Sequence, residues 1–318
     1  MRTLRRFFIH WQNWFGLTLV LFFIVVAFAA PQISPNDPIN PGPFQQVKGF
    51  RASDLSPKNP EQAPPLGTLP GRISVFHALI WGSRDALLFG LEVALSAAIF
   101  GIFYGAVAGY AGGWLNGLLM RISDAFLTFP VIAGVVLLRQ LWQLSFEAAG
   151  GAIYNGIIAF EPTGEISPLL RLLEWINPLT LTLILFSWMP YARLTNSMVA
   201  TIKQAEFIQA GRALGASPMH IILRHIIPNS ISPSVVLAAR DVGSMVILQA
   251  TFTFVGLAGG SVWGQMLVMG RNWIIGPGGN ILHFWWTFLP ATLALVFFGI
   301  GWNLLGDGIN DLLDPHGH

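Results

Sequence analysis

Three ionisable residues stand inside long apolar stretches of this 318-residue sequence and are the first candidates for chemistry. Glu92 lies in the apolar segment 87–110, and Arg240 and Asp241 are neighbours in the segment 232–257. A charge within an apolar span is costly, so such residues are usually functional or paired. We expect them to line a path through a membrane or to form an ion pair that includes Arg240. A structural pair between two helices is the simpler interpretation.

The other reactive residue types give no catalytic or metal-binding pattern. Among seven histidines only His220 and His225 are close in one segment, and their separation of five residues is a poor spacing for zinc ligands. The chain has no cysteine, which excludes thiol catalysis, and it has no phosphate-binding G-x-x-x-x-G-K-[ST] loop. No serine, histidine and aspartate set or carboxylate pair converges. The sequence therefore predicts a protein without catalytic residues, cofactor or metal.

The composition indicates a membrane protein. The chain is 53% hydrophobic and only 10% charged, whereas soluble domains carry about 25% charged residues. Its basic residues are scattered, so we expect no contact with nucleic acid. A helix of about 20 apolar residues crosses a bilayer. The apolar segments predict an all-α protein with six spans, within or near residues 7–36, 87–110, 126–144 (with a bend before Pro130), 179–199, 232–257 and 284–305.

The segments between these spans divide the chain. Residues 1–36 are expected to hold a cytoplasmic N-terminus and the first span, although Ala27-Phe28-Ala29 also resembles a signal-peptide cleavage site. Residues 37–85 are rich in proline and are expected to form an external loop, followed by a surface helix over 74–88. The core is then expected over 86–318, with an external loop at 145–178 that contains some short helix and a cytoplasmic loop at 201–230.

The arginines at the beginning of the chain orient it. Arg2, Arg5 and Arg6 precede the first span, and positive charge beside a span favours the cytoplasmic side. With six spans, both termini and the loop 201–230 are expected in the cytoplasm.

That loop contains the polar stretch "AEFIQAGRALGASPMHIILRHIIPN" (205–229), which is too short and too charged to span. Gly215 is expected to end a first helix. Ser217-Pro218 has the form of an N-cap followed by proline at the first helical position, and Pro228 is expected to end this second helix.

One surface of the first helix has few side chains. Small residues let another backbone approach closely, and such a surface suits insertion into a groove of a partner. An ordinary connector between spans is the alternative. The predicted apolar face consists of Phe207, Ala210, Gly211 and Leu214, and the small residues are Ala210, Gly211, Ala213, Gly215 and Ala216.

This stretch resembles the EAA loop of bacterial ATP-binding-cassette (ABC) importer permeases, in particular the C-type subunit of the dipeptide, oligopeptide and nickel branch. Gln209-Ala210-Gly211 takes the place of E-A-A, and Gly215 and Pro228 match the glycine and proline of the loop. The similarity covers most of the chain apart from 145–178. Its other motifs are "APQISPNDP" after the first span, "YAGGWLNGLLMRISDAFLTFP" (Tyr110–Pro130), "SWMPYARL" (Ser187–Leu194) and "WNLLGDGINDLLDP" (Trp302–Pro315).

The resemblance implies a type I ABC importer permease fold in a bacterial inner membrane. It implies a non-catalytic subunit that forms the path for peptides or similar solutes with a second permease. It further implies two ATPase subunits, an external substrate-binding protein that delivers the solute, and surrounding lipid as partners. The residues implied to contact the ATPases, through what we call the coupling loop (201–230), are Glu206, Gln209, Ala210, Gly211, Arg212, Ala213, Leu214, Gly215 and Ala216.

The sequence departs from the family pattern in three places. Gln209 replaces the usual glutamate, which removes a charge, and the segment 66–74 lacks two aspartates found in the family. The loop 145–178 is longer than expected, which indicates a specialised external face.

A secondary transporter or channel subunit without an ATPase is the alternative function. That class uses broken helices and charged sites at mid-membrane, for which Arg240-Asp241 is the only sign. A membrane-bound enzyme has no support in the sequence. The residues do not distinguish a dipeptide, oligopeptide, nickel or sugar as the solute.

Overall fold

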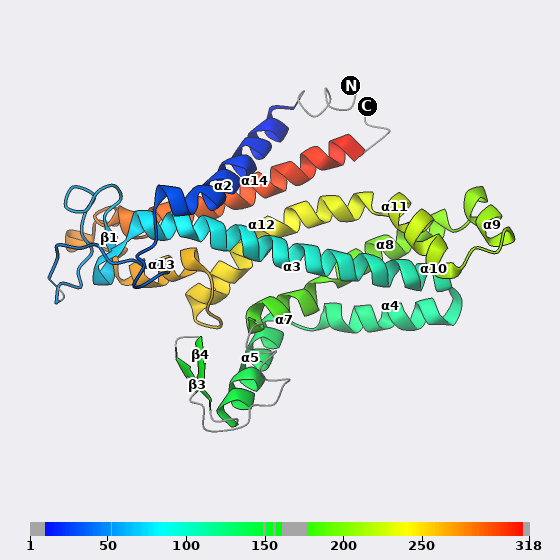
Figure 1. The fold of residues 1–318 in the computed structure, drawn as a ribbon, viewed down its shortest axis with the longest axis horizontal. Coiled ribbons are helices and arrows are strands. Elements are labelled where there is room, and N and C mark those ends of the chain that lie inside the picture. The colour runs from blue at the N-terminus through cyan, green and yellow to red at the C-terminus, as the bar shows by residue number, and fades with distance from the viewer. Residues whose placement is uncertain (1–9, 52, 149–150, 155–156, 161–176, 314–318) are drawn as a thin grey trace.

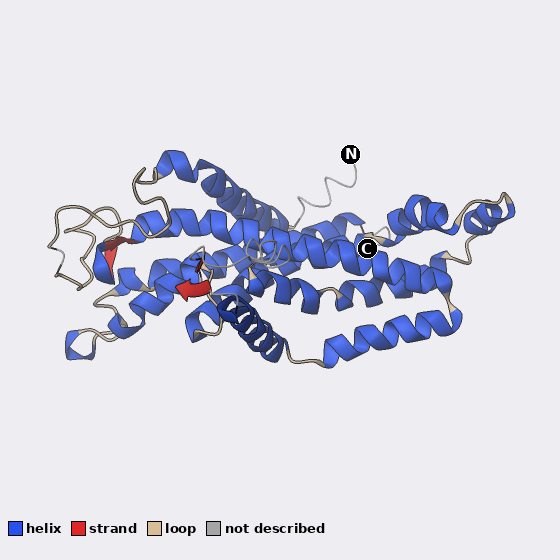
Figure 2. Ribbon diagram, turned by 60° about the horizontal axis from the view of Figure 1, so that its bottom comes forward, coloured by secondary structure: helices blue, strands red, loops and turns tan. Residues whose placement is uncertain are grey.

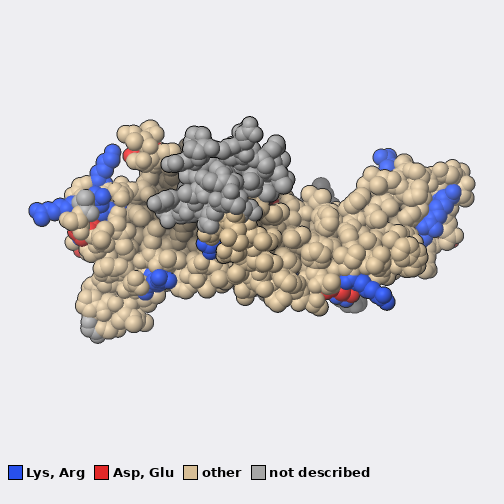
Figure 3. All heavy atoms as spheres, turned by 90° about the horizontal axis from the view of Figure 1, so that it is seen from below, with Lys and Arg blue, Asp and Glu red and all other residues tan. Residues whose placement is uncertain are grey.

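The structure is a computed structural model that describes residues 10–51, 53–148, 151–154, 157–160 and 177–313. It is an elongated bundle in which the long helices run roughly lengthwise (Figures 1 and 2). Most of the charged side chains visible in Figure 3 lie toward the two ends of the molecule. The main helices are α2 (Trp11–Ile33), α3 (Val75–Ala111), α4 (Gly113–Thr128), α5 (Val131–Ala148), α7 (Pro178–Ser187), α8 (Met189–Ile202), α12 (Ser232–Val255), α13 (Val262–Gly270) and α14 (Leu289–Leu313).

Four of these helices, α2, α3, α12 and α14, are long and apolar enough to cross a membrane. Helices α4 and α5 make a fifth span if the pair is counted as one. The angle between them is 85° at the break before Val131, which agrees with the bend predicted before Pro130. The expected span at 179–199 is divided between α7 and α8, because the chain bends where Pro190 enters the first turn of α8. The structure thus supports an all-helical membrane bundle with four or five spans.

Helix α3 is longer than the sequence predicted. The helix expected over 74–88 is present, but it is the first part of α3, which continues without a break into the next span. Its first turn is capped by Ser74, whose hydroxyl accepts a hydrogen bond from the N–H of His77 at 3.2 Å. At 1.5 Å per residue α3 is about 55 Å long, whereas the hydrocarbon core of a bilayer is about 30 Å thick. Helix α3 therefore extends beyond the membrane.

A compact loop structure covers the end of the bundle where α3 begins. Strands β1 (Thr68–Leu69) and β2 (Ile73–Ser74) form an antiparallel hairpin, with the 3₁₀ turn η1 (Pro70–Arg72) between them. Arg72 donates hydrogen bonds to the carbonyl of Phe50 and to Gln46. Nearby, the hydrogen bond from Lys58 to Asp54 lowers the pKa of that carboxyl to about 2.

In the loop 145–178, the end of α5 is followed by a hairpin that the sequence analysis did not predict. Strands β3 (Gly151–Tyr154) and β4 (Ile157–Phe160) pair in antiparallel fashion after α5. Residues 161–176 lie outside the described part of the chain. The sixth expected span also differs from the prediction, because Phe284–Phe288 is not part of α14. Three short 3₁₀ helices connect α13 to α14, namely η3 (Arg271–Trp273), η4 (Pro277–Gly279) and η5 (Trp285–Thr287).

The core joins helices that are distant in sequence. Phe23 of α2, Trp263 of α13 and Phe298 of α14 meet with ring centroids 5.2–5.8 Å apart in edge-on arrangements, a favourable geometry for aromatic side chains. At the opposite end Asn13 donates a hydrogen bond to Asp311 at 2.9 Å. The beginning of α2 and the end of α14 therefore lie together.

Candidate functional site

The coupling loop begins with helix α9 (Glu206–Ala213), at the far end of the bundle from β1 (Figure 1). Glu206 in the first turn and Arg212 in the last complement the helix dipole. The helix ends as predicted at Gly215, whose φ is +80°. The N–H of Ala216 bonds to the carbonyl of Gly211 and that of Gly215 to Arg212, both at 3.0 Å. This pair of bonds is a Schellman motif, which favours glycine at its left-handed position.

The second part of the loop starts where expected. The Ser217 hydroxyl accepts from the N–H of His220 at 3.3 Å, and helix α10 (Pro218–Ile221) follows. The prediction that this helix ends at Pro228 is wrong. A π turn, η2 (Ile222–Ile226), widens the helix, and α11 (Ile227–Ser230) continues through the proline toward α12. The π turn changes the hydrogen-bonding register just before Pro228, which has no N–H to donate.

Helix α9 contacts the rest of the chain through one fully buried side chain, Ile208. Ile208 belongs to a cluster with Ala106 of α3, Val199 of α8 and Ile222 and Ile226 of the loop. The predicted apolar face is largely exposed, and Leu214 is 88% exposed. A Cβ atom added at Gly211 or Gly215 would meet nothing within 4 Å. The small-residue surface of α9 is therefore open. Of the predicted contact residues, Gly211 and Ala216 are half-buried and Glu206, Gln209, Ala210, Arg212, Ala213, Leu214 and Gly215 are exposed.

Two basic side chains tie the loop to the end of α3. The guanidinium of Arg212 lies 4.7 Å from the ring centroid of Tyr110, a distance typical of a cation–π interaction. Lys203 donates a hydrogen bond to the carbonyl of Gly109 at 3.1 Å, and a cation at the C-terminus of a helix is favourable. Arg212 therefore has a role within the chain as well as the exposure expected of a partner contact.

Helix α3 packs against α8 through glycines that the sequence analysis did not single out. A Cβ at Gly101 would lie 2.3 Å from the Trp188 carbonyl oxygen, and one at Gly105 would lie 2.2 Å from the Ala192 carbonyl oxygen. At Gly109 it would lie 2.9 Å from Val199. The spacing of four residues, G-x-x-x-G-x-x-x-G, is the signal that could have revealed this contact. We call it the glycine seam (Gly101, Gly105 and Gly109 on α3 against α8).

The three charges predicted to pair within the membrane do not pair with one another. Arg240 forms an ion pair with Asp307 of α14, a partner that sequence reasoning missed. Asp241 accepts a hydrogen bond from the buried Tyr191 of α8 at 2.6 Å. Glu92 is exposed on α3 and has no hydrogen bond or ion pair with any described residue. The first two charges hold α12 to its neighbours, which leaves Glu92 as the unpaired member of the set.

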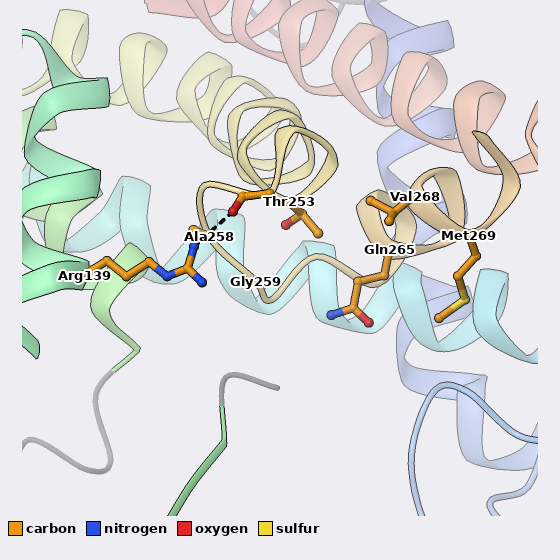
Figure 4. Close-up of a pocket in the computed structure, with 8 residues that line it drawn as sticks. Arg139, Thr253, Ala258, Gly259, Gln265, Val268 and Met269 are labelled. Carbon is orange, nitrogen blue, oxygen red and sulfur yellow. Dashed lines mark hydrogen bonds between the residues drawn. The ribbon is translucent and has the colours of Figure 1, made fainter. Parts of the chain in front are cut away.

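A recess of about 250 Å³ lies between α5 and the turn that follows α12 (Figure 4). Arg139 reaches across from α5 and donates to the carbonyl oxygens of Gly256, at 3.1 Å, and Leu257. Thr253 and Gln265 line the recess beside it. The arginine thus caps the C-terminus of α12, which accepts positive charge.

The histidines give no metal site among the described residues. His220 and His225 lie with their rings 5.9 Å apart. No group of three metal-ligating side chains occurs in the part of the chain that the structure describes. The features that stand out are therefore contact surfaces.

Comparison with known protein families shows to which class of protein the chain belongs. Residues 101–316 match the family described as "Binding-protein-dependent transport system inner membrane component". The chain belongs to this family. Residues 1–64 match the "N-terminal TM domain of oligopeptide transport permease C". The chain is therefore a non-catalytic, inner-membrane permease component of a binding-protein-dependent ABC transport system, as the resemblance implied.

Individual relatives cover most of the chain. A probable D,D-dipeptide transport system permease protein of Escherichia coli K12 is 28% identical over 94% of this chain and 86% of its own length. A dipeptide transport system permease of Alkalihalophilus pseudofirmus is 27% identical over 94% and 84%. A glutathione transport system permease of Escherichia coli O6:K15:H31 is 32% identical over 72% and 67%. The similarity extends across both the spans and the coupling loop.

Proposed function

We propose that this permease forms the translocation path for peptides or peptide-like solutes together with a second, different permease subunit, and that two ATPase subunits drive it through the coupling loop. The similarity to permeases named for dipeptides and glutathione supports this solute class. A complete set of six spans, with both termini and α9 in the cytoplasm, belongs to the same proposal. An external binding protein would deliver the solute.

The observation that carries the proposal is the open surface of α9. Only Ile208 of this helix is buried, Ala210 and Ala213 are exposed, and no atom of the described residues lies close to the Cβ position of Gly211 or Gly215. A helix that presents a flat, nearly bare surface suits a groove on another protein. The glycine seam and the Arg212–Tyr110 contact then connect this helix to α3 and α8, so that a displacement of α9 is transmitted to the spans.

Replacing Gly211 by leucine tests this assignment without disturbing the fold. The position is helical and open, and leucine has a higher helix propensity than glycine. We expect Gly211→Leu to insert normally but to lose at least tenfold in both solute uptake and recovery of the ATPase subunits. The matched control is Gly117→Leu on α4, which is also helical and open.

Two results would contradict the proposal. If Gly211→Leu retains wild-type uptake and ATPase recovery, α9 is not the ATPase contact. If the purified chain transports solute alone in vesicles, it is a secondary transporter or channel subunit instead.

A further inference from the structure

One exposed face of α3 carries side chains at the spacing of a helix-packing seam. Leu88, Glu92, Leu95 and Ile99 follow one another at intervals of four, three and four residues, and all are exposed. This repeat is that of the contact line between two helices that pack side by side. We call these four residues the α3 stripe. It lies on a different face of α3 from the glycine seam, and because its residues are exposed, α8 does not cover it.

Glu92 lies near the middle of the length of α3, on its exposed surface. It is about 25 Å from either end of α3, at 1.5 Å per residue. Gly90, two residues earlier on the same turn of α3, packs against Val242 and Val246, near the middle of α12. A carboxylate that faces lipid at this depth is costly, and no described residue pairs with Glu92. Lipid is therefore an unfavourable neighbour for Glu92, although it suits the three apolar residues of the stripe.

The outer end of this face already packs against a helix of the same chain. Trp81, seven residues before Leu88, donates a hydrogen bond to the Ser34 carbonyl at the end of α2 at 2.9 Å. Ser34 is also hydrogen bonded to His77, at 2.7 Å between Oγ and Nδ1. Beyond this point α2 diverges from α3 (Figure 1). The stripe therefore continues, along α3, a face that packs against the end of α2.

We propose that the α3 stripe docks a membrane-spanning helix of the second permease, and that this helix places a basic side chain opposite Glu92. The inference rests on the proposed function, which supplies the second subunit. Three apolar residues provide the contact area, and a single polar residue in an otherwise apolar seam specifies the partner and the register. A second copy of this chain fits poorly, because symmetric pairing along the stripe would bring Glu92 against Glu92.

Charge reversal in the complete transporter tests the pairing. With both permeases and the ATPases co-expressed, Glu92→Lys is expected to reduce recovery of the second permease at least tenfold, and Glu92→Gln to reduce it less because the amide still forms hydrogen bonds. The control Glu61→Lys makes the same charge change in the outer loop and should leave recovery at the wild-type level. Undiminished recovery with Glu92→Lys would overturn the inference.

A labelling experiment covers the case in which Glu92→Lys fails to insert. The natural chain has no cysteine, so Leu95→Cys reports on the stripe alone and Leu55→Cys, 65% exposed in the outer loop, reports on reagent access. In the assembled transporter a membrane-impermeant maleimide should modify Leu55→Cys but not Leu95→Cys.

Each other outcome has a distinct meaning. Modification of Leu95→Cys would show that the stripe faces water in the path and would overturn the docking assignment. Recovery of a second, differently tagged copy of this chain across the stripe would overturn the choice of partner. If the wild-type chain recovers no second permease, the proposed function itself has failed.

Discussion

Glycines occur both in the glycine seam and at the surface of the α9 segment, but they are closely packed in the first and open in the second. In the seam, glycines of α3 lie so close to the backbone at Trp188 and Ala192 and to the side chain of Val199 that no Cβ atom would fit. On α9, Gly211 and Gly215 meet nothing within 4 Å. The seam is a finished contact inside one chain, whereas the surface of α9 remains open to a partner. Small residues in a membrane protein therefore mark close approach, but the structure is needed to tell whether the approaching backbone is in the same chain.

Substitution in the glycine seam is expected to have a larger effect than substitution on α9. Gly105→Leu would force a side chain into the Ala192 carbonyl, which is backbone and has little freedom to move. We expect a loss of about 3 kcal/mol or more in stability, at the upper end of overpacking costs, and almost no folded protein. Thermal unfolding of the purified complex measures this loss, with Gly117→Leu as the open-site control. A folded Gly105→Leu protein with unchanged Tm would show that the two helices separate readily.

Removal of the side chain that attaches α9 to the bundle is expected to have an intermediate effect on stability. Ile208→Ala removes the one fully buried side chain of the helix, at a cost of about 2–4 kcal/mol by analogy with other buried Ile→Ala changes. Because this loss falls on α9, hydrogen exchange of its amides should accelerate more than tenfold while the spans stay protected. Phe207→Ala, on the exposed face, should leave exchange unchanged. Equal exchange in the two variants would mean that Ile208 does not anchor α9.

The smallest effect is expected from loss of the contact between Arg212 and the ring of Tyr110. Tyr110→Leu removes the ring below Arg212, and an exposed cation–π contact is worth about 0.5–1 kcal/mol, so transport should fall by about two- to fivefold. Tyr110→Phe keeps the ring and should retain full uptake. If Phe and Leu behave alike, the ring does not carry motion from α9 to α3.

The sequence was informative where periodicity and local chemistry decide the structure. The span at 232–257 appears as α12 with nearly the same limits, and Gly215 and Ser217-Pro218 end and begin helices as predicted. Apolar length and capping act within a few residues, so a single sequence shows them. Membership of the permease family was also evident from local motifs.

Sequence predictions failed where contacts between segments distant in sequence determine the structure. Asp307 is 67 residues from Arg240, and only packing of α14 on α12 brings them together. Periodicity groups Phe207, Ala210, Gly211 and Leu214 into one apolar face of α9, but it does not reveal that Ile208, outside that pattern, anchors the helix. Ile208 packs against residues of α3 and α8, which are distant in sequence, and a local pattern does not show such contacts. The roles of the nine predicted contact residues stay predictions until a partner is bound.

The length of α3 has a consequence for how the transporter is controlled. One unbroken helix begins beside the outer β1–β2 hairpin and ends at Tyr110, beneath Arg212 of the coupling loop. Under the proposed function, the place where solute arrives and the place where ATP is used are joined by a single rigid rod. Coupling between two sites is reciprocal in free energy. If nucleotide binding changes the affinity of the outer surface for the loaded binding protein, docking of that protein must change nucleotide affinity by the same factor. ATP would then be hydrolysed mainly when the binding protein carries solute.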